Sequence, residues 1–351
     1  MGAVPVQPPA TVSGRRPALS AHPAARAYRR ATSDRQPVAQ VEEIQVRRRS
    51  QVFRIRWAGG GSVIAKRCRH HMAAVEQAAY GVALPRAREH VRVPALLGWL
   101  RDPSADPADP FTWLFIEDMG SRRYSPMDAA QRRDLARWLG SVNAAVRPGF
   151  GVAIAALPVR GAGYYRQYLQ RAAEGIPALP ARRRLPAAMV ALTGRVGSAL
   201  GVLQRQWPGI VAVFDSVPLV LVHGDCLPKN IHLAGAAGEP TGPQVVPIDW
   251  GNAGWGLPAS DLGQSAVVLG DPVIGEACYE AYVQAALAGC PAGSADQVRR
   301  LAVLGRLLWS VKVLAMSVPG FRHDRLDKVE CELSAYTSVL IASLREWDEA
   351  S

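Results

Sequence analysis

Cysteine is scarce in this 351-residue sequence, and its five copies are not arranged in pairs. They are Cys68, Cys226, Cys278, Cys290 and Cys331, an odd number with no Cys-x-x-Cys spacing. This pattern argues against a disulfide framework and against a zinc site, and it is typical of a reducing compartment. We therefore expect a cytoplasmic protein in which Cys226 is a buried, unreactive thiol.

Long hydrophobic runs are also lacking. The most apolar segment, residues 211–222, is interrupted by Asp215 and Ser216, and no run approaches the ~20 residues that a membrane-spanning helix needs. Hydrophobic residues still make up 49% of the sequence, which is enough for a large core in a chain of this length. We expect a globular protein with two lobes and no membrane partner.

Acidic residues are few relative to basic ones, with 29 Asp and Glu against 41 Lys and Arg, a formal net charge of +12. Residues 1–40 contain a single acid, Asp34, among many Pro, Ala and Arg residues, and we expect them to form a disordered basic tail. A positive charge can favour nucleic acid. The sequence has neither a nucleic-acid motif nor the interleaved aromatic residues of a stacking surface, so we do not expect that partner.

Residues 41–119 carry strand signals. Five short apolar runs are separated by turns, and one helical segment interrupts them: strands at 41–46, 52–57, 63–67, 95–100 and 111–116, and a helix at 69–84. Lys66 lies in a strand that should be buried on both faces, so its ammonium group needs a partner. The pattern predicts a small antiparallel sheet.

Residues 120–351 carry helical signals instead. Apolar residues recur at helical spacing in three stretches: Leu135, Trp138, Leu139 and Val142; Leu192, Val196, Leu200 and Leu203; Leu333, Tyr336, Leu340 and Leu344. We assign these residues to a core. The sequence therefore predicts an α+β protein with a small sheet-based lobe at 41–119 and a larger helical lobe at 120–351.

Residues 219–262 contain the polar pattern that indicates function. An apolar run ends in His223, Gly224 and Asp225, Asn230 follows five residues later, and a second strand-like run delivers Asp249. In a metal-dependent phosphoryl-transfer site, one carboxylate meets the attacking hydroxyl, while an amide oxygen and a second carboxylate hold Mg²⁺ against the nucleotide phosphates. Each of these residues alone is common at a turn or strand end. Together they predict Asp225 as the catalytic base and Asn230 and Asp249 as Mg²⁺ ligands.

Three segments, HGDCLPKN, IDWGNAGWG and PASDLG, resemble the aminoglycoside phosphotransferase and choline kinase group, which has the protein-kinase-like fold. The resemblance implies ATP or GTP as the nucleotide, together with Mg²⁺. It also implies that His223 braces the catalytic loop and that Asp261 is structural.

The same resemblance places the nucleotide contacts. Lys66 should reach the α- and β-phosphates with Glu76 as its ion-pair partner, and Ser50 lies in the turn that should cover the phosphates. Glu117 and Met119 match the hinge, where backbone groups meet the adenine edge. Alternatives remain open, since a strand lysine can extend to water, Glu89 competes with Glu76, and the basic turn at 47–51 could simply be solvated.

The sequence departs from protein kinases in ways that bear on the acceptor. His-Gly-Asp replaces His-Arg-Asp, Leu227 occupies the position of the catalytic-loop lysine, and the stretch from Asp249 to Asp261 is too short for an activation loop. These departures argue against a protein substrate and favour a small hydroxyl compound.

The resemblance implies an aminoglycoside-type antibiotic, an amino sugar or a related natural product as acceptor, and hence a role in antibiotic resistance. A choline-like or hydroxy-amino-acid metabolite remains an alternative, as does a catalytically silent nucleotide-binding scaffold. An acidic pocket would suit a polycationic drug, and its candidate residues are Asp271, Glu276, Glu280, Asp324, Asp327, Glu330 and Glu332. An aromatic box would suit a choline-like cation.

Overall fold

The computed structural model describes residues 19–102, 106, 108, 110–149, 153–182, 184–235, 243–265, 267–268, 271–272, 274–286, 292–319 and 326–349. The chain divides into two compact units. The first contains the residues up to Arg69 together with Leu97–Asp118, and the second contains His70–Leu96 together with the residues from Met119 onward. The helix expected inside the N-terminal lobe, α2 (His70–Ala78), thus groups with the second unit.

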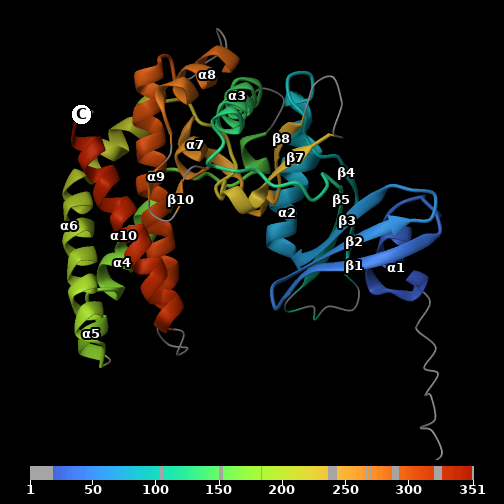
Figure 1. Cartoon of the computed structure of the whole chain (residues 1–351), viewed down its shortest axis with the longest axis horizontal. Helices are drawn as coiled ribbons and strands as arrows, with labels where there is room; N and C mark the ends of the chain where they lie inside the picture. The colour runs from blue at the N-terminus through green and yellow to red at the C-terminus, as the bar shows by residue number, and fades with distance from the viewer. Residues whose placement is uncertain are drawn as a thin grey trace, which may run out of the picture. The chain divides into compact units, whose positions relative to one another are not determined.

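The first unit is built on a five-stranded sheet with the order β1-β2-β3-β5-β4 (Figure 1). Its strands are β1 (Val38–Arg47), β2 (Ser50–Trp57), β3 (Ser62–Arg69), β4 (Leu96–Arg101) and β5 (Phe111–Glu117). The pairs β1–β2, β2–β3 and β3–β5 are antiparallel. The predicted sheet is therefore confirmed, and with the helical second unit it gives the predicted α+β fold.

Helix α1 (Pro23–Ala31) corrects the expectation of a disordered tail for residues 19–40. The helix starts at a proline, which suits the first helical position, and the side chain of His22 caps it. Ala24, Ala27 and Tyr28 pack into the apolar cluster on the sheet, and the ring of Tyr28 lies 5.2 Å from that of Phe115. Residues 1–18 of the expected tail lie outside the described residues.

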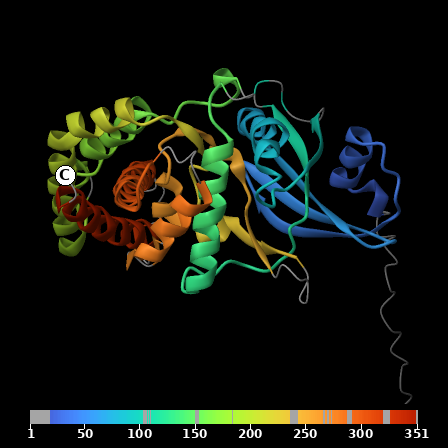
Figure 2. The same ribbon diagram turned by 90° about the horizontal axis from the view of Figure 1, so that it is seen from above.

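The second unit is mainly helical (Figure 2). Its helices are α2, α3 (Ala129–Ala145), α4 (Ala162–Gly175), α5 (Leu179–Arg182), α6 (Ala187–Ser216), α7 (Ser260–Ser265), α8 (Glu276–Ala286), α9 (Ala295–Ser317) and α10 (Leu326–Glu349). Helix α9 packs against α4, α7, α8 and α10, and most of its residues from Val298 to Ser317 are buried. A capping box formed by Ser294 and Gln297 fixes its start.

Three two-stranded ribbons complete the second unit. Strand β6 (Val220–Val222) pairs with β9 (Gly254–Gly256), β7 (Ile231–Ala234) pairs with β8 (Gln244–Pro247), and β10 (Val267–Val268) pairs with β11 (Asp271–Pro272). The first two ribbons carry the 219–262 segment. They place its two polar loops at neighbouring strand ends.

Helix α6 is the single helix among the described residues that is long and apolar enough to cross a membrane by length and composition. It contains Pro208, and it packs against α4 and α10 through a face that includes Leu192, Val196 and Leu203. A core helix of a globular protein meets the same criterion, so this finding is weak evidence for a membrane span.

Two glycines bring α7 against α9. A Cβ atom on Gly263 would lie 2.0 Å from the carbonyl oxygen of Ala302, and a Cβ atom on Gly305 would lie 2.2 Å from that of Ser260. Backbone atoms cannot move aside as a flexible side chain can. The close contact of the two helices therefore requires the absence of side chains at both positions.

We expect Gly305→Ala to lower the free energy of unfolding by at least about 1–3 kcal/mol, because an added methyl group overpacks the α7–α9 contact. Gly194→Ala is the matched control, since nothing lies within 4 Å of a Cβ atom at this position in α6. The control should stabilise the protein by about 0.5–1 kcal/mol through its better helix propensity. Urea unfolding of both variants measures the difference. Equal changes in the free energy of unfolding would contradict the close packing of α7 against α9 at Gly305.

Candidate active site

The loop after β6 is held by one buried carboxylate. The backbone N–H groups of His223 and Gly224 donate hydrogen bonds to the two carboxylate oxygens of Asp261, at 2.5 and 2.9 Å. Burial raises the pKa of Asp261, and the two backbone hydrogen bonds act in the opposite direction. Asp261 is at the start of α7, so the loop is fixed to the helix that the glycines bring against α9.

The ring of His223 joins the two polar loops of the segment. It is fully buried, its Nε2 atom donates to the carbonyl of Ile248 at 2.8 Å, and its Nδ1 atom accepts from the backbone N–H of Asp225 at 3.3 Å. The ring also packs on Trp250, with 4.6 Å between the ring centroids. Both nitrogens have backbone partners, so this histidine positions the loop.

Gly224 allows the same two loops to approach closely. Its φ is +71°, and a Cβ atom there would lie 2.5 Å from the carbonyl oxygen of Asn252. Both features require glycine. The His-Gly-Asp sequence, in place of His-Arg-Asp, therefore has a steric reason here.

Asp225 presents one held and one available carboxylate oxygen. Its Oδ2 atom accepts a hydrogen bond from the Asn230 amide at 3.1 Å and lies 3.4 Å from the ammonium group of Lys229. Its Oδ1 atom is buried and has no hydrogen-bond partner among the described residues. A buried acceptor of this kind costs free energy unless a donor satisfies it, and a substrate hydroxyl is a donor. The geometry thus suits a general base.

Asn230 has its amide protons committed to the loop. The amide nitrogen donates to the backbone carbonyl of Asp225 at 2.9 Å and to its carboxylate. The amide oxygen is thereby turned away from these acceptors and can serve as a metal ligand. The backbone N–H of Ile248 donates to the carbonyl of Asn230 at 2.8 Å, which ties Asn230 to the strand that precedes Asp249.

Asp249 has an unusual backbone conformation. Its φ is 66° and its ψ is 61°, which is the left-handed region that non-glycine residues rarely occupy. Its N–H donates to the hydroxyl of Tyr80 at 3.0 Å. Such strain persists where the surrounding structure holds it, and it commonly marks a functional position.

Asn230 and Asp249 together fit an Mg²⁺ ion. The described part of the chain contains no group of three or more His, Cys, Asp and Glu side chains that could hold a metal. A magnesium site that uses phosphates and water needs only one or two protein oxygens. The donor set of one amide oxygen and one carboxylate meets that need.

Glu76 lies beside the Asp249-Trp250-Gly251 segment. It is fully buried on α2, and a Cβ atom on Gly251 would lie 3.1 Å from its Oε1 atom. Glu89, the competing candidate, is exposed. The carboxylate of Glu76 thus lies in the second unit beside the segment that begins with the proposed metal ligand Asp249.

The remaining predicted residues occupy the first unit and its border. Ser50 begins β2 opposite Cys68, Lys66 is buried on β3 opposite Val52 and Leu114, and Glu117 ends β5 opposite Val63. Met119 is buried and belongs to the second unit. Lys66 and Glu76 belong to different units, so their pairing stays a prediction.

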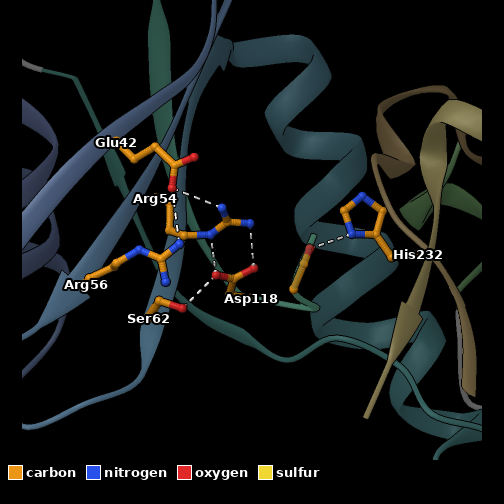
Figure 3. A network of polar contacts seen from close by, with 7 residues as sticks. Glu42, Arg54, Arg56, Ser62, Asp118 and His232 are labelled. Atoms are coloured by element: carbon orange, nitrogen blue, oxygen red, sulfur yellow. Dashed lines mark hydrogen bonds and ion pairs between the residues drawn. The ribbon is translucent and has the colours of Figure 1, made fainter. Parts of the chain in front are cut away.

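An ion-pair network holds the end of β5 (Figure 3). Asp118 accepts two hydrogen bonds from the Arg54 guanidinium, at 2.6 and 3.3 Å, and one from Ser62 at 2.6 Å. Arg54 also donates to Glu42 at 3.1 Å. Because Arg54 and Asp118 are both largely buried, the carboxylate between the predicted hinge residues Glu117 and Met119 is firmly held.

A second network ties the chain after Met119 to the catalytic loop. His232 donates from Nδ1 to the carbonyl of Gly120 at 2.8 Å (Figure 3). Its Nε2 atom accepts from Arg123 at 2.7 Å. Arg123 also donates to the carbonyl of Lys229 at 2.7 Å. Neither residue was assigned from the sequence, because their partners are more than 100 positions away.

Lys312 is a third residue of the site that was not assigned from the sequence. It lies on α9, only 5% exposed, and its ammonium group donates to the carbonyl of Gly224 at 3.1 Å and to the Asn252 side chain at 3.4 Å. Burial lowers the pKa of Lys312 to about 8, against the attraction of Asp225. One signal was available, since Lys312 is the only charged residue in the helical stretch 307–317.

Aromatic rings and a second cation surround Lys312. Its ammonium group lies 5.0 Å from the ring centroid of Trp309 and 5.9 Å from that of Tyr164. Arg160 stacks on the same Tyr164 ring at 4.6 Å and donates to the carbonyls of Asn252 and Ala253, each at 3.2 Å. The neighbourhood of Asp225 in the second unit is thus basic and aromatic.

The acidic candidates for a cationic substrate do not form a described cluster. Glu276, Glu280 and Glu330 are exposed and Glu332 is half-buried. Asp324 lies outside the described residues, and the side chains of Asp271 and Asp327 are not described. Cys226 is buried, and burial raises its pKa well above the usual range, so it remains a thiol.

Comparison with known proteins identifies a family. Residues 40–299 match the family model described as "Phosphotransferase enzyme family". No curated protein matches the chain. Solved structures with the same fold include a microcompartment-associated aminopropanol kinase, with 18% identity, a TM-score of 0.60, and coverage of 89% of this chain and 93% of that chain.

Two further structures are also similar. A phosphotransferase solved with GDP and kanamycin has 17% identity, a TM-score of 0.56, and coverage of 92% of this chain and 98% of that chain. A macrolide 2'-phosphotransferase from Brachybacterium faecium has 17% identity, a TM-score of 0.51, and coverage of 87% and 94%. At these identities the likeness establishes the kinase-like fold, as predicted, and nothing finer.

The lowered pKa of Lys312 gives a testable pH dependence. Between about 8 and the ordinary value of 10.5, the unfolded chain binds more protons than the folded one, so the contribution of Lys312 to stability rises with pH. From pH 7 to 9.5, the unfolding free energy of the wild type should rise by about 2 kcal/mol relative to that of Lys312→Met. Arg299→Met, an exposed change on the same helix, should show no such trend in urea unfolding. A constant difference for Lys312→Met would contradict the shift.

Proposed function

From the premise that the chain belongs to the phosphotransferase enzyme family, and is thus a small-molecule phosphotransferase acting on hydroxyl groups, we propose that it transfers the γ-phosphate of ATP or GTP to its acceptor with Mg²⁺. The observation that supports this best is the Oδ1 atom of Asp225, which is buried and has no hydrogen-bond partner among the described residues. Asn230 binds the other oxygen of Asp225, and its carbonyl accepts from Ile248, the residue before Asp249. These three residues supply a base and a metal-binding pair on one loop and the strand end next to it.

Asp225 acts on the acceptor hydroxyl. The hydroxyl donates its hydrogen bond to Oδ1, and its oxygen attacks the γ-phosphorus as the bond to the bridging oxygen of the nucleotide breaks. The proton passes to Asp225, and the products are a phosphate ester and the nucleoside diphosphate. Asn230 and Asp249 would hold Mg²⁺, which when bound would supply positive charge against the phosphates.

The nucleotide contacts follow the same scheme. Lys66 binds the α- and β-phosphates and is oriented by Glu76, while Ser50 and its turn cover the phosphates. The backbone at Glu117 and Met119 meets the base. The burial of Lys66 and Glu76 supports these roles, because buried charges need partners.

The acceptor is a small hydroxyl compound. The kanamycin complex and the macrolide enzyme among the similar structures favour an aminoglycoside-type antibiotic, an amino sugar or a related natural product, and a role in resistance. The aminopropanol kinase favours a small amino alcohol or hydroxy-amino-acid metabolite instead. A silent scaffold is disfavoured because Asp225, Asn230 and Asp249 are all present. We place the reaction in the cytoplasm, with no nucleic-acid or membrane partner.

Asp225→Asn should lower kcat by at least about 100-fold, because an amide cannot take the hydroxyl proton. Release of ADP from ATP is measured against a panel of kanamycin, an amino sugar, choline, serine and a macrolide. Calorimetry should find binding of Mg-ATP largely intact in the variant. Wild-type turnover in Asp225→Asn would remove the proposed base.

Asp249→Ala should weaken nucleotide binding only when Mg²⁺ is present. The loss of a carboxylate ligand should raise the Kd for Mg-ATP by at least about 10-fold. The Kd measured with EDTA should change little, because the metal link is then absent in both proteins. Equal weakening with and without Mg²⁺ would assign Asp249 a role in folding instead.

A further inference from the structure

Lys312 and Arg160 are two cations that share their partners. Both donate to Asn252, Arg160 to its backbone carbonyl and Lys312 to its side-chain oxygen. Both also lie over the ring of Tyr164. All of these partners are neutral. Two like charges at one residue repel each other, and a nearby anion would remove that cost.

The part of the chain that the structure describes supplies no anion in contact with these cations. Among the described residues, no carboxylate oxygen lies within 4.0 Å of Lys312 or Arg160. The neighbouring carboxylates have other partners, since Asp261 accepts from the loop backbone and Asp225 from Asn230. A lysine that is 5% exposed is seldom left without a counter-charge.

The two aromatic rings beside Lys312, those of Trp309 and Tyr164, already have cations of the protein over them. The Lys312 ammonium group lies over Trp309 and Tyr164, and Arg160 covers Tyr164 as well. A choline-like or aminoglycoside cation binds best to unoccupied ring faces or to carboxylates. At this point of the site it would meet two resident cations instead.

We infer that the acceptor carries an oxyanion, a carboxylate or a phosphate group, which binds to Lys312 and Arg160 while its hydroxyl meets Asp225. This inference rests on the proposed function and narrows its substrate class. Lys312 donates to the carbonyl of Gly224, the residue before Asp225, so the anion and the reacting hydroxyl are close together in the acceptor. A compact hydroxy acid or a phosphorylated polyol has this shape.

The first arm of the test compares acceptors that differ in one charge. Glycerate and glycerol 3-phosphate are each paired with glycerol, and kanamycin and choline represent cations. The wild type should prefer an anionic member by about 10- to 100-fold in kcat/KM, the scale of a charge-assisted hydrogen bond. The preference between glycerate and glycerol 3-phosphate distinguishes a carboxylate from a phosphate.

Variants test whether Lys312 reads the charge. Lys312→Met should abolish the preference mainly through KM, Lys312→Arg should retain part of it, and the exposed control Arg299→Met should leave it unchanged. Thermal melting confirms that each variant is folded. Arg160→Met removes the second cation of the proposed site and should also weaken the preference for anionic acceptors. A uniform fall in kcat for every acceptor, with KM unaltered, would leave Lys312 as a brace of the loop only and overturn the inference.

The second arm does not depend on turnover. With the nucleotide site saturated by AMP-PNP and Mg²⁺, calorimetry measures the binding of inorganic phosphate and of malonate. Wild type and Arg299→Met should bind at least one of these anions about 10-fold more tightly than Lys312→Met. If no acceptor of any charge is phosphorylated, the proposed function fails, and this arm still decides the anion subsite. Equal anion affinities in all variants, or a preference for cationic acceptors that survives Lys312→Met, would overturn the subsite.

Discussion

The candidate active site depends on one buried carboxylate. Asp261 accepts hydrogen bonds from two consecutive backbone N–H groups, those of His223 and Gly224, and so sets the course of the chain directly before Asp225. A buried ionised carboxylate is costly unless hydrogen bonds satisfy it, and here the loop itself provides them. Loop and helix therefore stabilise each other. The glycine contact between α7 and α9 extends this support, because it fixes the helix that carries Asp261.

The same principle of mutual support brings the metal-binding residues together. His223 donates to the carbonyl of Ile248, and Ile248 donates to the carbonyl of Asn230, so the strand that ends at Asp249 is joined to the catalytic loop at two points. Lys312 adds a third connection through Gly224 and Asn252. Rigid placement of this kind is what phosphoryl transfer requires, since the protein contributes mainly orientation and charge.

Sequence reasoning found the part of the site that is encoded locally. Asp225, Asn230 and Asp249 lie on one loop and the next strand, so their spacing limits where they can be. The strands of the first unit also have strong alternating signals. Helix α1 was missed because its apolar face consists mostly of small alanines within a segment rich in proline and arginine. Its order comes from Tyr28 packing on Phe115. Sequence reasoning missed Arg123, Arg160 and Lys312. The backbone carbonyls to which they donate lie 88 to 106 positions away along the chain.

The residues that sequence reasoning missed change the expected chemistry of the acceptor. A positive net charge on the whole chain constrains only its general behaviour, whereas Lys312 donates to Gly224, the residue before the base, and shares Asn252 with Arg160. Lys312 is held by a carbonyl and an amide oxygen, which anchor its ammonium group without neutralising it. Its charge is therefore fixed in position and still available. A fixed, desolvated cation selects against other cations more strongly than a solvated one, because no water screens the repulsion. The residue that anchors the catalytic loop is thus placed to determine which acceptors the loop can receive.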